Sequence, residues 1–189
     1  PNQQFIFQNE TDLEIVKKWL ALSQNQIHLI KGSGIDLKEY VFKLSDTKSM
    51  VVGLPSRMVW SKGVKEFVEA AQLVRKIHTH VRFGLIGGID NAADSIPEER
   101  IRSWVSKGIV EWWGFCDDMQ KVYRKLDVVC LPSYREGLPR CLLEAMALGV
   151  PVMTTTAPGC KETVEHMKSG YLFPERSVKG LSKAVEYFI

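Results

Sequence analysis

Short apolar runs alternate along this chain with amphipathic stretches. We expect the apolar runs to form strands at Gln4–Phe7, Ile27–Ile30, Ser49–Leu54, Val81–Ile86, Ile109–Trp113, Asp127–Leu131 and Val150–Thr154. Consecutive apolar positions in these runs are typical of strands buried on both faces of a parallel sheet. Helical periodicity predicts helices at residues 12–22, 64–77, 97–107, 119–125, 139–148 and 160–167. The alternation predicts an α/β fold with a doubly wound, parallel, Rossmann-like sheet.

A polar stretch with two glycines, residues 31–48, separates the first two strands from the others. The strand, helix and strand before it are typical of the last unit of a preceding domain. We therefore assign residues 1–45 to the end of an amino-terminal Rossmann domain and a linker, and residues 46–189 to a second Rossmann-like domain. The chain starts at Pro1 and stops inside an apparent helix, so we expect a piece of a larger protein, truncated at the carboxyl end of that domain.

Composition narrows the range of functions. Apolar residues make up 45% of the 189 residues and charged residues 25%, which is typical of a soluble globular protein. A net charge of +3 without a dense Lys/Arg tract does not favour nucleic acid, and it fits an anionic small molecule or membrane surface. The four cysteines form no C-x-x-C pair, and no histidine cluster has metal-ligand spacing, so we expect a reduced, cytoplasmic protein without a metal.

The candidate chemistry lies after the strands of the main domain. In an open α/β sheet, ligands bind beyond the carboxyl ends of the strands. Arg57 and Lys62 follow the first of these strands. Arg binds phosphate through two parallel hydrogen bonds and Lys adds a compact charge, so the two residues are candidates to clamp a diphosphate. The alternative is a pair of solvated surface cations.

Glu136 and Glu144 are separated by seven residues in the segment PSYREGLPRCLLEAMALGVPV. Glu136 precedes Gly137 and Leu138, whose backbone amides we expect to face a ligand at a helix start. Its carboxylate is then placed to hold sugar hydroxyls or to stabilise positive charge at a reacting sugar carbon. The alternative is an acidic residue that offsets the helix dipole.

Glu144 lies in an apolar helix, where an unpaired charge is costly. Ribose hydroxyls would give its carboxylate a partner, and an internal ion pair is the alternative. Two further loops carry weaker signals. Gly87 permits close approach of a ligand to the backbone or forms an ordinary turn, whereas Gly114 and Phe115 either meet a base or belong to a strand end and its core.

Two segments resemble the retaining glycosyltransferases of group 1, family four, which have two Rossmann domains in the arrangement called GT-B. GLPSRMVWSKGVKEFVEAA is similar to the Arg…Lys-Gly segment of the family, and the stretch from Ile109 to Phe173 is similar to its signature half. The resemblance covers the carboxyl-terminal, donor-binding domain, about residues 49–174.

The resemblance implies a role for each matching residue. Arg57 and Lys62 would bind the diphosphate of a nucleotide-sugar and act in catalysis together with Glu136, which would contact the transferred sugar. Glu144 would hold the ribose. The remaining roles fall to backbone and loop positions: the amides of Gly137 and Leu138 would meet phosphate or sugar, Gly114 and Phe115 the base, and Gly87 the donor. Leu138 stands where an aromatic residue is frequent in the family.

The implied reaction is metal-independent sugar transfer with retention of configuration. PGCKETV is similar to members that extend lipid-linked bacterial surface glycans, which favours a UDP-sugar donor and a lipid-diphosphate acceptor. The acceptor would bind a missing amino-terminal domain, so the chain alone would be inactive. The full-length protein would be cytoplasmic and associate peripherally with the inner face of the membrane. Alternatives are a nucleotide-sugar epimerase or a phosphorylase of the same fold, and a non-catalytic Rossmann interaction module.

Overall fold

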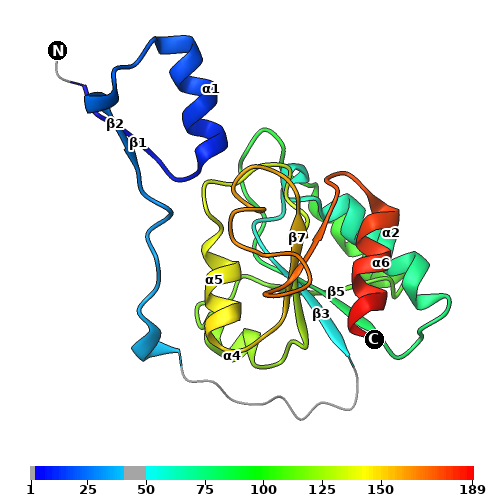
Figure 1. Ribbon diagram of the computed structural model, residues 1–189. Coiled ribbons are helices and arrows are strands. Elements are labelled where there is room, and N and C mark those ends of the chain that lie inside the picture. Colours follow the sequence, from blue (N-terminus) through cyan, green and yellow to red (C-terminus); the bar gives the residue numbers. More distant parts are fainter. Residues whose placement is uncertain (1–2, 41–49) are drawn as a thin grey trace.

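A computed structural model describes residues 3–40 and 50–189 of the chain (Figure 1). Its main body is a six-stranded, all-parallel sheet in the order β5-β4-β3-β6-β7-β8. The strands are β3 (Val51–Pro55), β4 (Arg82–Ile86), β5 (Glu111–Gly114), β6 (Val128–Leu131), β7 (Val152–Thr155) and β8 (Tyr171–Phe173). The predicted doubly wound parallel sheet is confirmed.

The strand order reverses direction at the centre of the sheet. The chain runs outward from β3 through β4 to β5, and then returns to pair β6 with the other side of β3. Val52 and Gly53 of β3 lie opposite Val128 and Val129 of β6. In open α/β sheets, ligands bind at the carboxyl ends of the two strands where the order reverses. The loops after β3 and β6 therefore form the expected place for a site.

Helices cover both faces of the sheet (Figure 1). One face packs against α2 (Val64–Arg75), α3 (Glu98–Ser106) and α6 (Val178–Phe188), in a core that includes Phe67, Phe83 and Leu181. The other face packs against α4 (Met119–Tyr123) and α5 (Arg140–Ala147), whose Tyr123 and Leu142 are buried. All residues of β3, β6 and β7 are buried, because both faces of these strands are covered.

A smaller unit precedes the main body. It consists of β1 (Phe5–Phe7), α1 (Glu10–Leu20) and β2 (Ile27–Leu29), with β1 and β2 paired in parallel, and short 3₁₀ turns at Gln24–Gln26 and Leu37–Glu39. Figure 1 shows this unit beside the loop that leads into α5. The contact is made by the turn at the start of α1, where Asn9 hydrogen-bonds the backbone of Glu136 and Gly137, and Asp12 pairs with Arg135.

Two sequence expectations about the main body need correction. The predicted helix at residues 160–167 is wrong, because this segment forms turns. The Glu162 carboxylate accepts from the Gly159 amide at 2.7 Å and the Thr163 hydroxyl donates to the Cys160 carbonyl at 2.6 Å, so side chains compete with helical backbone bonds. Strand β8 was not predicted. The proposed domain boundary between residues 45 and 46 lies outside the described residues.

Candidate functional site

Lys62 and Glu136 meet where the strand order reverses. Lys62 ends a 3₁₀ turn, Trp60–Lys62, after β3, and Glu136 lies in the loop after β6. The Lys62 Nζ is 2.5 Å from the Glu136 Oε1, and the side chains are only 20% and 14% exposed. Two of the predicted catalytic residues, 74 positions apart in sequence, thus form one half-buried ion pair.

Gly63 allows the two loops to approach so closely. Its φ is +70°, in the left-handed region, and a Cβ at this position would lie 2.1 Å from the carbonyl oxygen of Pro132. The turn at Glu136 is held by a second contact, because its amide donates to the Pro158 carbonyl at 2.9 Å. Glycine is therefore required for the backbone contact that brings Lys62 to Glu136.

A cavity of about 250 Å³ opens beside this point, at the ends of β3 and β4. Four of the predicted donor-binding residues line it: Arg57, Gly87, Phe115 and Glu144. Most of its other walls are apolar or backbone groups, and Phe115 is 77% exposed. An apolar cavity with a few convergent polar groups is the usual form of a small-molecule site.

The other predicted residues lie outside the lining of this cavity. Gly114 ends β5 with φ +70°, and its carbonyl accepts from the Gly87 amide at 2.7 Å. Gly137 and Leu138 continue the turn that carries Glu136. The site thus has two parts: the cavity, and the adjacent turn with the Lys62–Glu136 ion pair.

Arg57 is paired with an acidic loop. Its guanidinium donates to the Asp90 carboxylate, from the loop after β4, and its side chain is 64% exposed. Nearby, hydrogen bonds from the Ser61 hydroxyl and amide lower the pKa of Asp94. The acidic partner of Arg57 was not expected from the sequence, because a single Asp in a loop carries no local signal of its partner.

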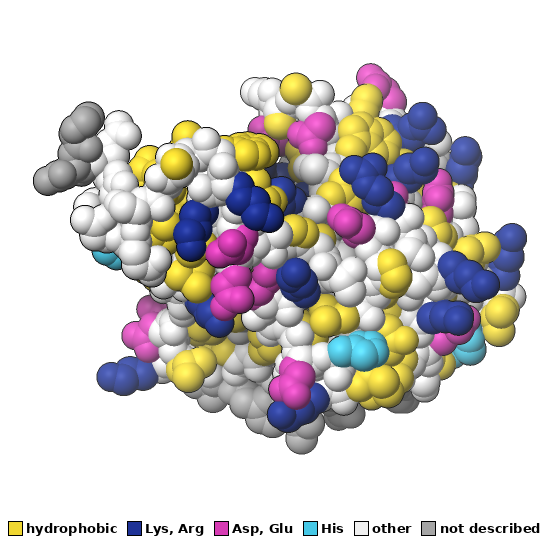
Figure 2. Space-filling model, turned by 45° about the horizontal axis from the view of Figure 1, so that its top comes forward, with side chains coloured by type: hydrophobic (Ala, Val, Ile, Leu, Met, Phe, Trp, Pro, Cys, Tyr) yellow, Lys and Arg dark blue, Asp and Glu magenta, His cyan; other side chains and the backbone are white. Residues whose placement is uncertain are grey.

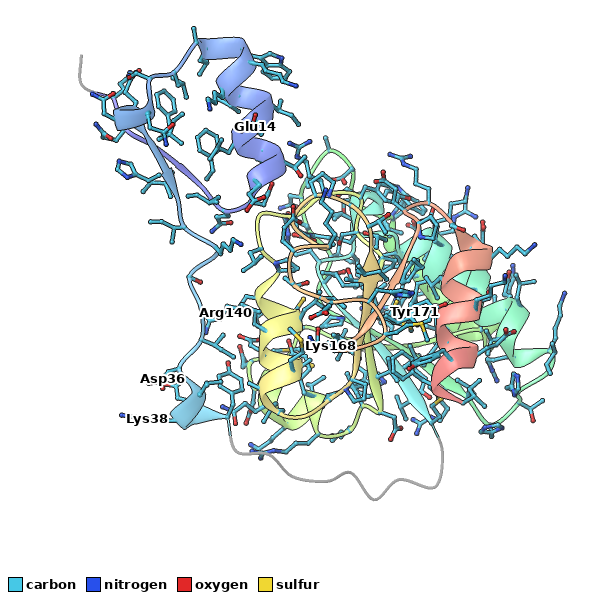
Figure 3. The ribbon with its side chains drawn as sticks, in the orientation of Figure 1. Glu14, Asp36, Lys38, Arg140, Lys168 and Tyr171 are labelled. Carbon is cyan, nitrogen blue, oxygen red and sulfur yellow. The ribbon has the colours of Figure 1, made fainter. Side chains whose placement is uncertain are left out.

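Glu144, on α5, has partners on α4 and α5, and Tyr40 interacts with the same carboxylate. One carboxylate oxygen accepts from the Arg140 Nε at 2.8 Å, and the other accepts from the Tyr123 hydroxyl at 3.0 Å. The internal ion pair that was left open as an alternative is therefore present. Burial, followed by nearby charges that include Glu144, raises the pKa of Tyr123. Figure 3 shows Arg140 on the side of α5 that faces the segment with Asp36 and Lys38.

Several features of the site were not found by sequence reasoning. Trp112 and Trp113 pack against the two cores, whereas Phe115 lines the cavity and is exposed. Tyr123 and Cys141 line the cavity although their sequence context is that of ordinary apolar helix residues. Only the packing of α4 against α5 brings them to the site.

The surface above the site carries mixed charge. Figure 2, which brings the upper end of the view in Figure 1 forward, shows basic side chains interspersed with acidic ones. This agrees with the pairing of Arg57 and Lys62 with carboxylates. Within the described ranges, no group of three or more His, Cys, Asp or Glu side chains could hold a metal ion. No helix among the described residues has the length and apolar character needed to cross a bilayer.

The sequence of the main body matches a known family. The model of the family "Glycosyl transferases group 1" matches residues 49–189. The chain belongs to this family. The match covers every strand that contributes to the site, so the resemblance noted in the sequence is confirmed.

Curated relatives come from bacterial glycan synthesis. The chain is 30% identical, over 98% of its length, to the N,N'-diacetylbacillosaminyl-diphospho-undecaprenol alpha-1,3-N-acetylgalactosaminyltransferase of Campylobacter jejuni, of which it covers 51%. It is 27% identical over 81% of its length to the capsular polysaccharide biosynthesis glycosyltransferase CapM of Staphylococcus aureus, of which it covers 40%. The chain thus spans about half the length, or less, of these relatives.

Solved structures share the fold. A glycosyltransferase from Rickettsia africae superposes with a TM-score of 0.85 at 17% identity, over 99% of this chain and 53% of that one. Anabaena Alr3699/HepE in complex with UDP superposes with a TM-score of 0.81 at 22% identity, over 98% of this chain and 53% of that one. At these identities the likeness supports the fold, and the GT-B assignment of this domain is consistent with it.

Proposed function

We propose that this chain is the donor-binding part of a glycosyltransferase that moves a sugar from a UDP-sugar to a lipid-linked acceptor, with retention of configuration. The observation that carries the proposal is the meeting of Lys62 and Glu136 at the reversal of the strand order, next to a cavity lined by Arg57 and Glu144. Cations, a carboxylate and an apolar wall then lie within one site, as a nucleotide-sugar requires.

The paired side chains keep capacity to bind a donor. An ammonium has three N–H donors and a guanidinium has five. One Lys62–Glu136 contact and one Arg57–Asp90 contact therefore leave donors for diphosphate oxygens. Arg140, Tyr123 and Tyr40 interact with the Glu144 carboxylate. A carboxylate has about four lone-pair sites, so acceptance from a ribose hydroxyl would still fit.

The same residues account for the chemistry of the proposed reaction. Breaking the bond from the anomeric carbon to the diphosphate leaves negative charge on the departing phosphate. Arg57, Lys62 and the amides of Gly137 and Leu138 would stabilise this charge, and such electrostatic stabilisation is often the largest catalytic contribution. The Glu136 carboxylate, 2.5 Å from the Lys62 ammonium, would contact the transferred sugar.

The names of two relatives support the proposed acceptor. The Campylobacter jejuni relative is named for a lipid-diphosphate acceptor, and CapM for capsular polysaccharide. We infer a lipid-linked acceptor for this protein in the synthesis of a bacterial surface glycan, at the cytoplasmic side of the membrane. A peripheral contact with the membrane would bring the enzyme to such an acceptor.

Donor binding tests the proposal directly. Isothermal calorimetry and thermal unfolding would be measured with UDP, UDP-glucose, UDP-N-acetylgalactosamine and GDP. We expect UDP-linked ligands to raise the unfolding temperature, because a ligand that binds only the folded state stabilises it by mass action. Lys62→Ala should lower UDP affinity by at least about tenfold, the equivalent of one charge-assisted hydrogen bond of about 1.5–3 kcal/mol.

Lys168→Ala is the matched control. Lys168 also pairs with a carboxylate, Glu165, but its side chain is 73% exposed and it does not line the cavity. This variant should bind UDP like the unmodified chain. Absence of binding to every nucleotide would contradict the proposal. With the full-length gene product, transfer of the sugar to a lipid-linked acceptor, and not an epimerised donor, is the expected product.

A further inference from the structure

Asn9, at the start of α1, lies against the turn that carries Glu136. Its side chain is 1% exposed, although it belongs to the small unit outside the main sheet. The Oδ1 accepts from the Asp12 amide at 2.8 Å, which caps α1. The Nδ2 lies 3.2 Å from the Glu136 carbonyl oxygen and 3.0 Å from the Gly137 carbonyl oxygen.

The environment fixes the orientation of this carboxamide. The Nδ2 faces three oxygens, those of the two carbonyls and the Asp12 carboxylate at 2.9 Å, whereas the Oδ1 faces an N–H group. In the reversed orientation, the Oδ1 would face three acceptor oxygens and the Nδ2 would face the N–H donor of Asp12. Asn9 therefore donates to the turn and caps the helix at the same time.

The two carbonyl contacts determine where the following amides point. In a planar trans peptide the C=O and N–H groups point in opposite directions, and none of the described peptide bonds is cis. Because the Glu136 and Gly137 carbonyls point toward Asn9, the amides of Gly137 and Leu138 point away from it. Neither amide donates to an acceptor within the part of the chain that the structure describes.

We infer that Asn9 is a positioning residue that orients the Gly137 and Leu138 amides toward the phosphate or sugar of the donor. This inference rests on the proposed function. Gly159 packs against the same two carbonyls, because a Cβ there would lie 2.1 Å from the Glu136 carbonyl oxygen and 2.7 Å from that of Gly137. The small unit supplies the Asn9 hydrogen bonds, and Gln8 of the same unit packs against Gly137.

Two substitutions separate this role from the helix cap. Asn9→Ser keeps a good N-cap residue, because Ser and Asn are about equally preferred there, but it removes the two donors to the carbonyls. Asn9→Asp also keeps the cap and places an oxygen against the carbonyls. We would measure the affinities for UMP, UDP and UDP-glucose by calorimetry. Both variants should lose about tenfold or more in affinity for UDP and UDP-glucose, and UMP affinity should stay within about twofold, because UMP has neither a β-phosphate nor a transferred sugar.

Ser177→Ala is the control for a purely structural effect. Ser177 caps α6 through a 3.0 Å bond to the Gly180 amide, and it makes no contact with the Glu136 turn. Loss of this helix cap should lower the unfolding temperature without changing the ratio of UDP affinity to UMP affinity. Hydrogen exchange at the Glu136 amide, which donates to the Pro158 carbonyl, should be faster in both Asn9 variants and unchanged in Ser177→Ala.

Three outcomes would count against the inference. If the unmodified chain binds none of the three nucleotides, the proposed function fails and this inference fails with it. If the unmodified chain prefers UDP to UMP and both Asn9 variants keep that preference, the positioning role alone is overturned. An equal loss of UMP, UDP and UDP-glucose affinity would assign Asn9 a structural role only.

Discussion

The contact between Gly63 and Pro132 gives the sharpest test of how the site is built. In Gly63→Ala, the new Cβ would lie 2.1 Å from a backbone oxygen and 2.8 Å from the carbonyl carbon of Pro132. Neither atom belongs to a flexible side chain, so the loops after β3 and β6 must separate by more than about 1 Å to reach ordinary van der Waals contact near 3.5 Å. The left-handed φ of +70° adds a conformational cost.

Gly108→Ala separates the two contributions. Gly108 has nearly the same φ, +65°, but nothing lies within 4 Å of a Cβ built there. The free energy of unfolding of this variant should fall only by the cost of the left-handed conformation, about 1–2 kcal/mol. The free energy of unfolding of Gly63→Ala should fall by that amount and by a further ~1–3 kcal/mol, because the new Cβ overpacks the contact with Pro132. Gly63→Ala should also weaken UDP binding, since it displaces Lys62 from Glu136, whereas Gly108→Ala should not.

Urea unfolding followed by circular dichroism would measure both free energies of unfolding. For a chain of this size, 1 kcal/mol corresponds to a shift of about 2–4 °C in unfolding temperature, so the difference is measurable. Equal losses in the two variants, within about 0.5 kcal/mol, would refute the close backbone contact. An unchanged UDP affinity in Gly63→Ala would refute its link to the Lys62–Glu136 pair.

Two further predictions concern buried polar groups. Tyr134→Phe removes the 2.8 Å hydrogen bond from the Tyr134 hydroxyl to the buried Glu66 carboxylate, and it should lower the free energy of unfolding by about 1–3 kcal/mol in urea titrations; a loss below about 0.3 kcal/mol would mean that water replaces the hydroxyl. Burial raises the pKa of Cys141 to about 12 and that of Cys160 to about 11, from an ordinary value of 9.0. Because the unfolded thiols lose their protons first, this contribution to stability is fully present below pH 9.0 and is lost as the pH rises to about 11 for Cys160 and about 12 for Cys141. The free energy of unfolding should therefore fall as the pH rises over this range, and it should fall less steeply in Cys160→Ala. Identical slopes in the variant and the unmodified chain would contradict a buried, protonated thiol at Cys160.

Much of the main body could be predicted from the sequence, because its signals are local. Strands β3 to β7 coincide with apolar runs to within two residues at each end. The segment 160–167 was mistaken for a helix because its apolar spacing fits one, whereas the carboxylate of Glu162 and the hydroxyl of Thr163 bind the backbone instead. Strand β8, Tyr171–Phe173, follows this mistaken segment and was not predicted.

The sequence by itself determined the doubly wound fold, the family and the identity of the candidate side chains, because hydrophobic periodicity and motif spacing are properties of neighbouring residues. The tertiary structure decided which groups meet. Lys62 and Glu136 are 74 positions apart, and Asn9 lies 127 positions from Glu136. These contacts depend on the reversal of strand order between β3 and β6 and on the small unit docking against a loop. Such contacts follow from the packing of whole elements, which no local pattern encodes.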